Sequence, residues 1–180
     1  LDNMNNAVAS SPVIFRSQSS GGSFAGQKEI TAFSDADGLA AVDFTLGTIA
    51  GFHEVTAFHP GISGSEIKFT LPALPDSPKS VHIVTGNNQT AKIGATLPDS
   101  LRIKVIDLYK NPTPDQTVVF MALNGGKILS PEWATTDSEG SAACQVALGD
   151  SSGIYYFMAL VDTLKSEFFQ ATALPEVNNR

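Results

Sequence analysis

Apolar and polar residues alternate in short segments along the whole chain. After Gly140, the apolar residues on one face of such a segment are Ala142, Cys144, Val146 and Leu148. An earlier segment, after Gly38, repeats the pattern with Ala40, Val42, Phe44 and Leu46. A period of two is typical of β-strands that bury one face, and no segment shows the sustained period of about 3.6 residues that marks a helix. The pattern predicts an all-β chain.

Gly, Asp, Asn and Pro separate the strand-like segments. In the first part of the chain we expect further strands at Pro12–Ser17, Glu29–Phe33, His53–Phe58 and Glu66–Leu71. In the second part we expect them at Ser80–Thr85, Leu101–Ile106, Thr117–Ala122, Tyr155–Val161 and Glu167–Thr172. Strands that recur every 8–12 residues or so, with turn residues between them, are typical of an antiparallel β-sandwich.

The chain contains an internal repeat, which the strand-like segments and their turns share. The first match aligns Asp2–Asn6 with Asp107–Asn111. Later matches, in the same order, align Val13–Phe15 with Val118–Phe120, Gly21–Gly22 with Gly125–Gly126, Asp35–Gly38 with Asp137–Gly140, and Ala73–Pro75 with Ala173–Pro175. The spacing changes only between strand-like segments, where loops tolerate deletions. The ordered matches indicate two copies of one repeat.

The second copy begins with a segment, residues 76–106, that has no counterpart in the first copy. We therefore predict a partial β-sandwich over residues 1–75, a complete one over residues 76–175 and a tail over residues 176–180. The absent segment should supply two strands. Without them, partners are missing for the inward side chains of Val13, Phe15, Val42 and Phe44. Either the rest of a longer protein or a strand from another polypeptide would fill the gap.

The connection between the copies contains two prolines, Pro75 and Pro78. Short connections of this kind are stiff. We expect an elongated pair of modules with a limited hinge at Leu74–Pro78.

The second copy also carries a characteristic set of turn motifs. These are Val84–Thr90, Leu97–Pro98, Val105–Asp107, Asn111–Pro114, Gly125–Gly126, Thr136–Gly140, Leu148–Gly149 and Gly153. The set resembles the bacterial Ig-like repeat of the invasin and intimin type (bacterial Ig-like domain group 1), over Lys79–Ala173 and, without the front of the repeat, over Asp2–Ala73. Trp133 departs from the small polar loop that is usual there. The resemblance implies tandem immunoglobulin-like antiparallel β-sandwiches of seven strands, strung along extracellular or cell-surface proteins.

Composition excludes several classes of partner. Hydrophobic residues make up 42% of the 180 residues, which suffices for packed cores. Eleven Lys and Arg against 18 Asp and Glu give a net charge of −7, and without a basic run the chain is not suited to binding nucleic acid. The longest apolar run, Ile154–Val161, is too short to cross a bilayer, so we expect no membrane insertion. The single cysteine excludes an intrachain disulfide.

The candidates for chemistry have simpler interpretations. Asp35–Gly38 resembles the start of a calcium loop, but Leu46 stands where an EF-hand has its bidentate Glu, so we favour a hairpin turn and leave calcium binding open. Cys144 aligns with Val42, which predicts a buried, unreactive thiol. No partners at metal-site spacing accompany His53, His59 and His82. With no nucleophile or acid–base constellation and no phosphate-binding loop, we expect no enzyme, no cofactor and no metal site.

One predicted strand carries a candidate contact surface. Its first face holds Tyr155, Phe157, Ala159 and Val161, and its opposite face holds Tyr156, Met158 and Leu160. The first copy has Glu54, Thr56 and Phe58 at the latter positions, which suit water better. Either the second copy buries both faces of the strand, or it exposes an apolar strip that contacts a partner. Trp133 is a further candidate for that contact.

Three functions fit these features. The favoured one is a non-catalytic stalk, spacer or adhesive segment of a protein that is extracellular or on the bacterial cell surface. Its partners would be neighbouring Ig-like repeats, or strands of the same protein or another subunit, and a host or cell-surface protein or glycan. The alternatives are a subunit of a surface filament completed by strand addition, and an accessory module of a secreted carbohydrate-active enzyme. The latter predicts a platform of aromatic side chains drawn from Trp133, Tyr109 and Tyr156.

Overall fold

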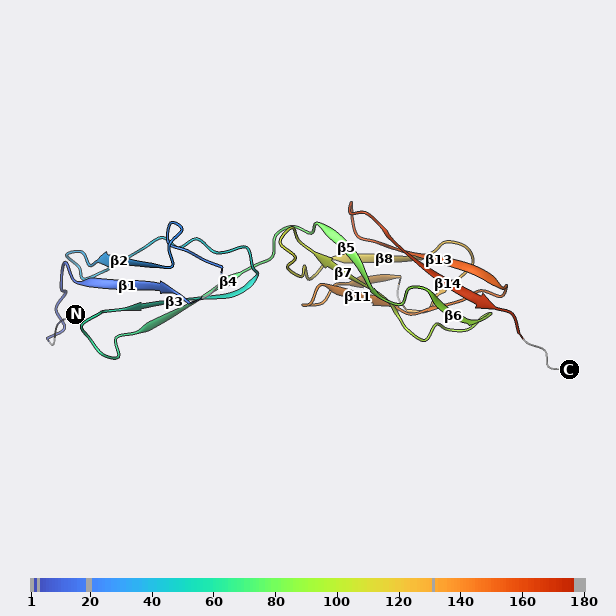
Figure 1. The fold of residues 1–180 in the computed structure, drawn as a ribbon, viewed down its shortest axis with the longest axis horizontal. Coiled ribbons are helices and arrows are strands. Elements are labelled where there is room, and N and C mark those ends of the chain that lie inside the picture. The colour runs from blue at the N-terminus through green and yellow to red at the C-terminus, as the bar shows by residue number, and fades with distance from the viewer. Residues whose placement is uncertain (1, 3, 19–20, 131, 177–180) are drawn as a thin grey trace. The chain divides into compact units, whose positions relative to one another are not determined.

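A computed structural model describes residues 2, 4–18, 21–130 and 132–176 (Figure 1). Every regular element in these ranges is a β-strand, which confirms the predicted all-β fold. The chain divides into two compact units, residues 1–75 (unit 1) and residues 76–180 (unit 2). Within the tail predicted over residues 176–180, residues 177–180 lie outside the described part of the chain.

Unit 1 is built on one antiparallel sheet. Across the sheet its strands are β2 (Glu29–Phe33), β1 (Pro12–Ser17), β3 (Gly51–Phe58) and β4 (Ile67–Ala73). Side chains at alternate positions of β1 and β3 point to one face, where Phe15, Val55 and Ala57 join Phe24 in a small buried core. The ring of Phe44 completes this cluster, with its centroid 5.0 Å from that of Phe24.

Unit 2 has two main sheets. The larger one has five strands, in the order β10 (Trp133–Thr135), β8 (Thr117–Ala122), β13 (Gly153–Leu160), β14 (Glu167–Leu174) and β6 (Gln89–Lys92). The smaller one has three, in the order β11 (Ser141–Cys144), β7 (Leu101–Ile106) and β5 (Ser80–Thr85). A short pair joins β12 (Val146–Ala147) to β9 (Lys127–Ile128). Both main sheets contribute to one buried core, in which Ile103, Phe120, Phe157 and Phe169 are almost fully enclosed.

Aspartate side chains fold the turns between strands. In the turn before β11, the Asp137 carboxylate accepts hydrogen bonds from the backbone N–H groups of Glu139 and Ser141, each at 2.9 Å. Gly140 adopts a positive φ of 70° there, and its carbonyl accepts the N–H of Val105 on β7 at 2.8 Å. Local side-chain bonds of this kind fix a turn without help from the rest of the fold, which explains why the motif recurs in both copies.

Asp107 fixes the start of unit 2 in the same way. Its carboxylate accepts the backbone N–H groups of Tyr109 and Asn111 at 2.8 Å, the Asn111 side-chain amide at 2.7 Å and the N–H of Asp76 at 3.0 Å. Burial by itself raises the pKa of Asp107, but these hydrogen bonds to the charged form outweigh it and hold the pKa below the usual value. The backbone N–H of Asp76, the first residue of unit 2, is therefore hydrogen-bonded to a buried carboxylate.

Most strand predictions agree with the structure. The predicted bounds of β1, β2, β5, β7 and β8 are confirmed, and β3, β4, β13 and β14 differ from the predicted ranges by a few residues. The alternating segment after Gly140 forms two strands with a break at Gln145: β11 pairs with β7, and β12 pairs with β9. The sequence analysis missed β6, β9 and β10, which are two to four residues long.

The front segment of unit 2 differs from the prediction. Residues 76–106 supply three strands, β5, β6 and β7, instead of the two expected. β6 pairs with β14 in parallel, an exception in a sandwich predicted to be antiparallel. In unit 1, the prediction of a strand at Ala40–Leu46 is wrong. Only Thr45 forms a bridge there, to Ser23. The equivalent β11 forms because it pairs with β7, and the described residues of unit 1 hold no counterpart of β7.

Candidate interaction surface

Part of the solvent side of the five-stranded sheet of unit 2 is an apolar surface, hereafter the outer face, to which β10, β8, β13 and β14 contribute side chains. Strand register arranges them in rows. One row joins Trp133 on β10, Val119 on β8 and Leu160 on β13. The next row joins Met121 on β8, Met158 on β13 and Phe168 on β14. Tyr156 follows on β13, opposite Gln170.

Several of these side chains are exposed to solvent. Trp133 is 65% exposed, Phe168 55%, Met121 43% and Tyr156 42%, while Met158 and Leu160 are half-buried. The alternate residues on β13 point into the core, where Tyr155, Phe157 and Ala159 are buried, as the sequence predicted. The sequence left open whether both faces of this strand are buried or whether one face is an exposed apolar strip. The structure has the exposed apolar strip.

The structure brings the four predicted contact residues onto one face. Tyr156, Met158 and Leu160 share one side of β13, and Trp133 joins them through the row that crosses Val119. The sequence analysis missed Met121 and Phe168, although both occupy alternating outward positions in predicted strands. Tyr109, the third aromatic considered for a sugar platform, lies in the Asp107 turn between β7 and β8 and not in the five-stranded sheet.

The pairing registers of the two units match position by position, and they show that one row of this surface is polar in unit 1, whereas the row Ile14–Phe58, equivalent to Val119–Leu160, is apolar in both units. Met121, Met158 and Phe168 form one row of the outer face, and the corresponding row in unit 1 is Arg16, Thr56 and Lys68. Glu54 occupies the position of Tyr156, in agreement with the repeat alignment.

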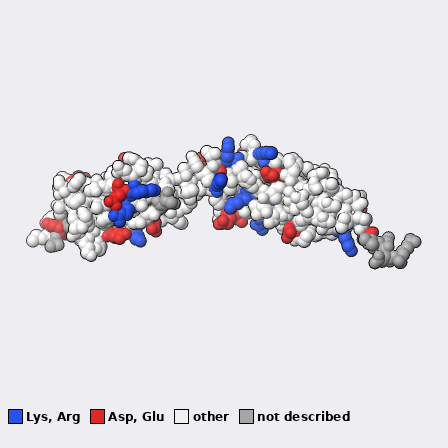
Figure 2. All heavy atoms as spheres, in the orientation of Figure 1, with Lys and Arg blue, Asp and Glu red and all other residues white. Residues whose placement is uncertain are grey.

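Unit 1 stabilises these polar positions with surface interactions. Arg16 forms an ion pair with Glu29 at 2.7 Å and lies over the ring of Phe58 at 5.1 Å. In the view of Figure 2, acidic and basic side chains gather over the sheet of unit 1, and uncharged atoms cover most of the visible surface near β13 and β14. The sheet therefore forms with charged residues at these places, so its folding does not require the apolar outer face of unit 2.

Trp133 lines two hollows near β10. One, of about 350 Å³, lies over Met121 and Ile128, and the other, of about 530 Å³, lies over Leu160. The charged residues that line the two hollows are Glu132, Asp115 and Asp162. An exposed indole beside two hollows with an acidic rim suits a partner that inserts apolar side chains and carries basic groups around them.

The structure places the other sequence candidates in hydrogen-bonded turn and strand positions. The Asp35 carboxylate accepts the N–H groups of Asp37 and Leu39 at 3.0 and 2.9 Å, which forms the turn that the sequence favoured, although the strand expected to complete a hairpin does not follow it. His53 is buried and hydrogen-bonded to the Ile49 carbonyl at 2.9 Å. Within the described residues, no group of three or more His, Cys, Asp and Glu side chains could hold a metal ion.

Cys144 is buried, as predicted. The Ser130 hydroxyl donates to its sulfur at 3.4 Å, and burial raises the pKa of the thiol. A thiol with a raised pKa carries little thiolate at neutral pH, so the site does not favour a nucleophile.

In the described part of the chain there is no helix of the length and hydrophobicity needed to cross a bilayer.

Comparison with known proteins shows the fold. No protein-family profile matches the sequence, and no curated protein matches it. Among solved structures, Yersinia pseudotuberculosis InvD has a TM-score of 0.55 and 21% identity over 99% of this chain, which spans 52% of the InvD chain. The chain thus has the fold of invasin-type Ig-like domains.

Two further solved structures are similar at lower TM-scores. The adhesin InvE of Yersinia pseudotuberculosis has a TM-score of 0.43 and 20% identity over 96% of this chain, which spans 51% of InvE. A β-glycosidase from Bacteroides vulgatus has a TM-score of 0.48 and 10% identity over 90% of this chain, which spans 21% of the enzyme.

Proposed function

We propose that this chain is a non-catalytic segment of a bacterial cell-surface protein, in which Ig-like units form a stalk and the outer face of unit 2 binds a partner. The fold, the internal repeat and the proline-containing connection support the stalk. The observation that carries the proposal is the outer face itself, because unit 1 has Arg16, Thr56 and Lys68 where unit 2 has Met121, Met158 and Phe168.

The composition of the outer face resembles that of binding sites. Protein interfaces are enriched in Trp, Tyr, Phe and Met at their centres and depleted of charges there. The strand residues that form the rows of the outer face include Trp133, Tyr156 and Phe168 and no charged side chain. An exposed apolar surface of this kind marks contact with another molecule. Its partner would be a protein with an apolar centre and a basic rim, on a neighbouring repeat or on another cell.

The experiment exchanges the outer face for its counterpart in unit 1. The triple variant M121R/M158T/F168K places in unit 2 the residues that unit 1 already tolerates at the same register positions, so we expect it to fold. Beads coated with the natural chain should adhere to layers of cultured epithelial cells or to cells of the source bacterium. The triple variant should lose at least about tenfold of that adhesion, corresponding to about 1.4 kcal/mol.

The matched control is Leu108→Lys, an apolar-to-charged change at a turn residue that is 63% exposed and lies outside the five-stranded sheet. This variant should adhere like the natural chain. Equal adhesion of the triple variant and the natural chain would show that the outer face does not mediate the contact.

A further inference from the structure

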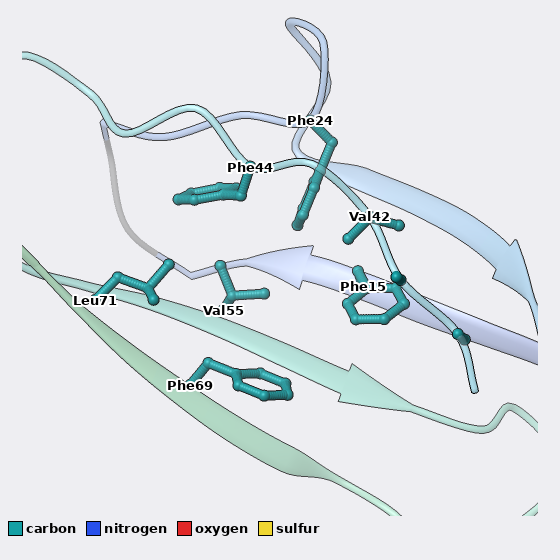
Figure 3. Close-up of a pocket in the computed structure, with 9 residues that line it drawn as sticks. Phe15, Phe24, Val42, Phe44, Val55, Phe69 and Leu71 are labelled. Atoms are coloured by element: carbon teal, nitrogen blue, oxygen red, sulfur yellow. The ribbon is translucent and has the colours of Figure 1, made fainter.

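Unit 1 contains an open apolar groove of about 430 Å³, between its sheet and the segment Ala40–Phe44. Figure 3 shows the side chains that line it: Val55, Phe69 and Leu71 extend from the strands, and Val42 and Phe44 face them from the opposite side. Phe15 and Phe24 also line the groove, and in this view the ring of Phe24 lies between Phe44 and Val42. The groove is thus a two-sided apolar space in which the second side is a single extended segment.

The same positions in unit 2 are closed. Phe69 is 44% exposed, while its equivalent on β14, Phe169, is 0% exposed. Val42 and Phe44 are half-buried, while their equivalents Cys144 and Val146 are buried. The two units therefore share the groove-forming side chains and differ in what covers them.

Three strands of the front segment cover this space in unit 2. β7 pairs with β11, which places Leu101 opposite Cys144 and Ile103 opposite Ala142, and both side chains are fully buried. β6 pairs in parallel with the edge of β14, and β5 pairs with β7. In unit 2 the space is therefore filled by an extended segment, β7. Its inward residues, Leu101, Ile103 and Val105, alternate with outward ones.

Unit 1 has the backbone edges that such a segment needs. β4 is the last strand of its sheet in the described residues, whereas β14 continues to β6. The segment Leu39–Val42 is equivalent to β11, but no ladder partner is assigned to it. An open edge beside an apolar groove is the arrangement used in β-strand addition, in which main-chain hydrogen bonds give affinity and alternating pockets give specificity.

We propose that the groove of unit 1 binds the front segment of an Ig-like repeat of this same type, one that is not engaged in a sandwich of its own. The bound segment adds one strand to Leu39–Val42, a second strand beside the first and a parallel strand to the edge of β4. Its apolar residues at alternating positions bury Val42, Phe44 and Phe69. This inference does not depend on the outer face of unit 2.

The test uses a synthetic peptide with the sequence of residues 76–106 as a stand-in for that segment. Hydrogen exchange of the full chain is followed by mass spectrometry with and without excess peptide. We expect slower exchange, by at least about tenfold, in two regions of unit 1: residues 39–44 and residues 67–73. A control peptide with Leu101→Asp and Ile103→Asp places charges at the inward positions and should give no protection.

A second measurement keeps the test valid where the free peptide binds too weakly to detect. The segment of residues 76–106 is joined to the beginning of the chain through a flexible Gly/Ser linker, which raises its effective concentration to roughly millimolar. Protection of residues 39–44 and 67–73 in this fusion, but not in the fusion that carries the two Asp substitutions, supports the proposal. Equal exchange in the two fusions, or protection confined to unit 2, overturns it.

The M121R/M158T/F168K variant separates this inference from the proposed function. Its outer face is exchanged while the groove of unit 1 is unchanged, so it should respond to the peptide like the natural chain. A response lost in this variant would mean that the peptide binds the outer face, which overturns the groove proposal.

Discussion

Phe69 and Phe169 form a matched pair, because they occupy the same position in the two copies but differ in their surroundings. Phe69 pairs with Val55 and Phe169 with Phe157 in equivalent registers, and their exposed fractions are 44% and 0%. Replacing a fully buried phenylalanine by alanine costs about 3–5 kcal/mol, because lost transfer free energy and an unfilled cavity add together. We expect Phe169→Ala to lower the free energy of unfolding of unit 2 by this amount.

For Phe69→Ala we expect a smaller loss. Full burial of a phenylalanine side chain contributes about 1.5–3 kcal/mol, and scaling by the part of Phe69 removed from water leaves about 1–2 kcal/mol. The cavity contribution is small, because the groove beside Phe69 is already open to solvent.

Hydrogen exchange resolved by peptide is the assay that separates the two units. The only Trp and all three Tyr lie in unit 2, so ultraviolet fluorescence of these residues does not report on unit 1. Exchange of the most protected amides of each unit, measured in increasing urea, gives a free energy of opening for each. If Phe69→Ala destabilised unit 1 by as much as Phe169→Ala destabilises unit 2, the groove would be closed in solution, and the argument from its exposure would be refuted.

Three further predictions concern unit 2. Cys144 should react with a thiol reagent far more slowly in the native chain than in denaturant, and Cys144→Ser should cost about 1–3 kcal/mol, since a hydroxyl replaces a buried apolar group. Asp107 has a lowered pKa when folded, so its stabilising contribution is complete above its unfolded value of about 3.9 and is lost as the pH falls through the lower folded value. Asp107→Asn should therefore flatten the decline in unfolding free energy that begins as the pH falls below about 4. Gly140→Ala should destabilise unit 2 by at least about 2 kcal/mol, because φ is +70° and a Cβ would lie 2.5 Å from the Val105 carbonyl oxygen. Gly38→Ala, at the equivalent turn with nearest atoms at 3.3 Å, should have a smaller effect on unit 1; equal losses at the two glycines, measured by thermal or urea unfolding, would contradict the steric argument.

Most of the longer strands could be predicted because their signals are local. Asp137 and Gly140 specify a turn through hydrogen bonds within five residues, and the segments between such turns alternate with a period of two. β10 and β6 were not predicted, because their formation depends on strands that are distant in the sequence. They have three and four residues, too few for a period to show, and they form because β8 and β14 offer edges to pair with.

The outer face could be predicted only in part. Tyr156, Met158 and Leu160 lie on one strand, so alternation along the chain is enough to group them. Met121 and Phe168 lie far from them in sequence and flank Met158 only because β8 and β14 pair with β13 in one particular register. A single sequence does not specify such a register directly, since a shift of two residues would preserve the same alternation.

The segment Ala40–Phe44 has one feature of a β-strand, alternating side chains that face an apolar space, but among the described residues it lacks the other, a hydrogen-bonded backbone partner. Its alternation predicts which side chains face the groove, and Val42 and Phe44 do face it. A strand also requires a backbone partner, and the equivalent β11 finds that partner in β7. Alternation therefore encodes burial on one side and not pairing. Val42 and Phe44 therefore line an open groove without a paired backbone beside them, and on the proposal made above these are the residues that would recognise an added extended segment.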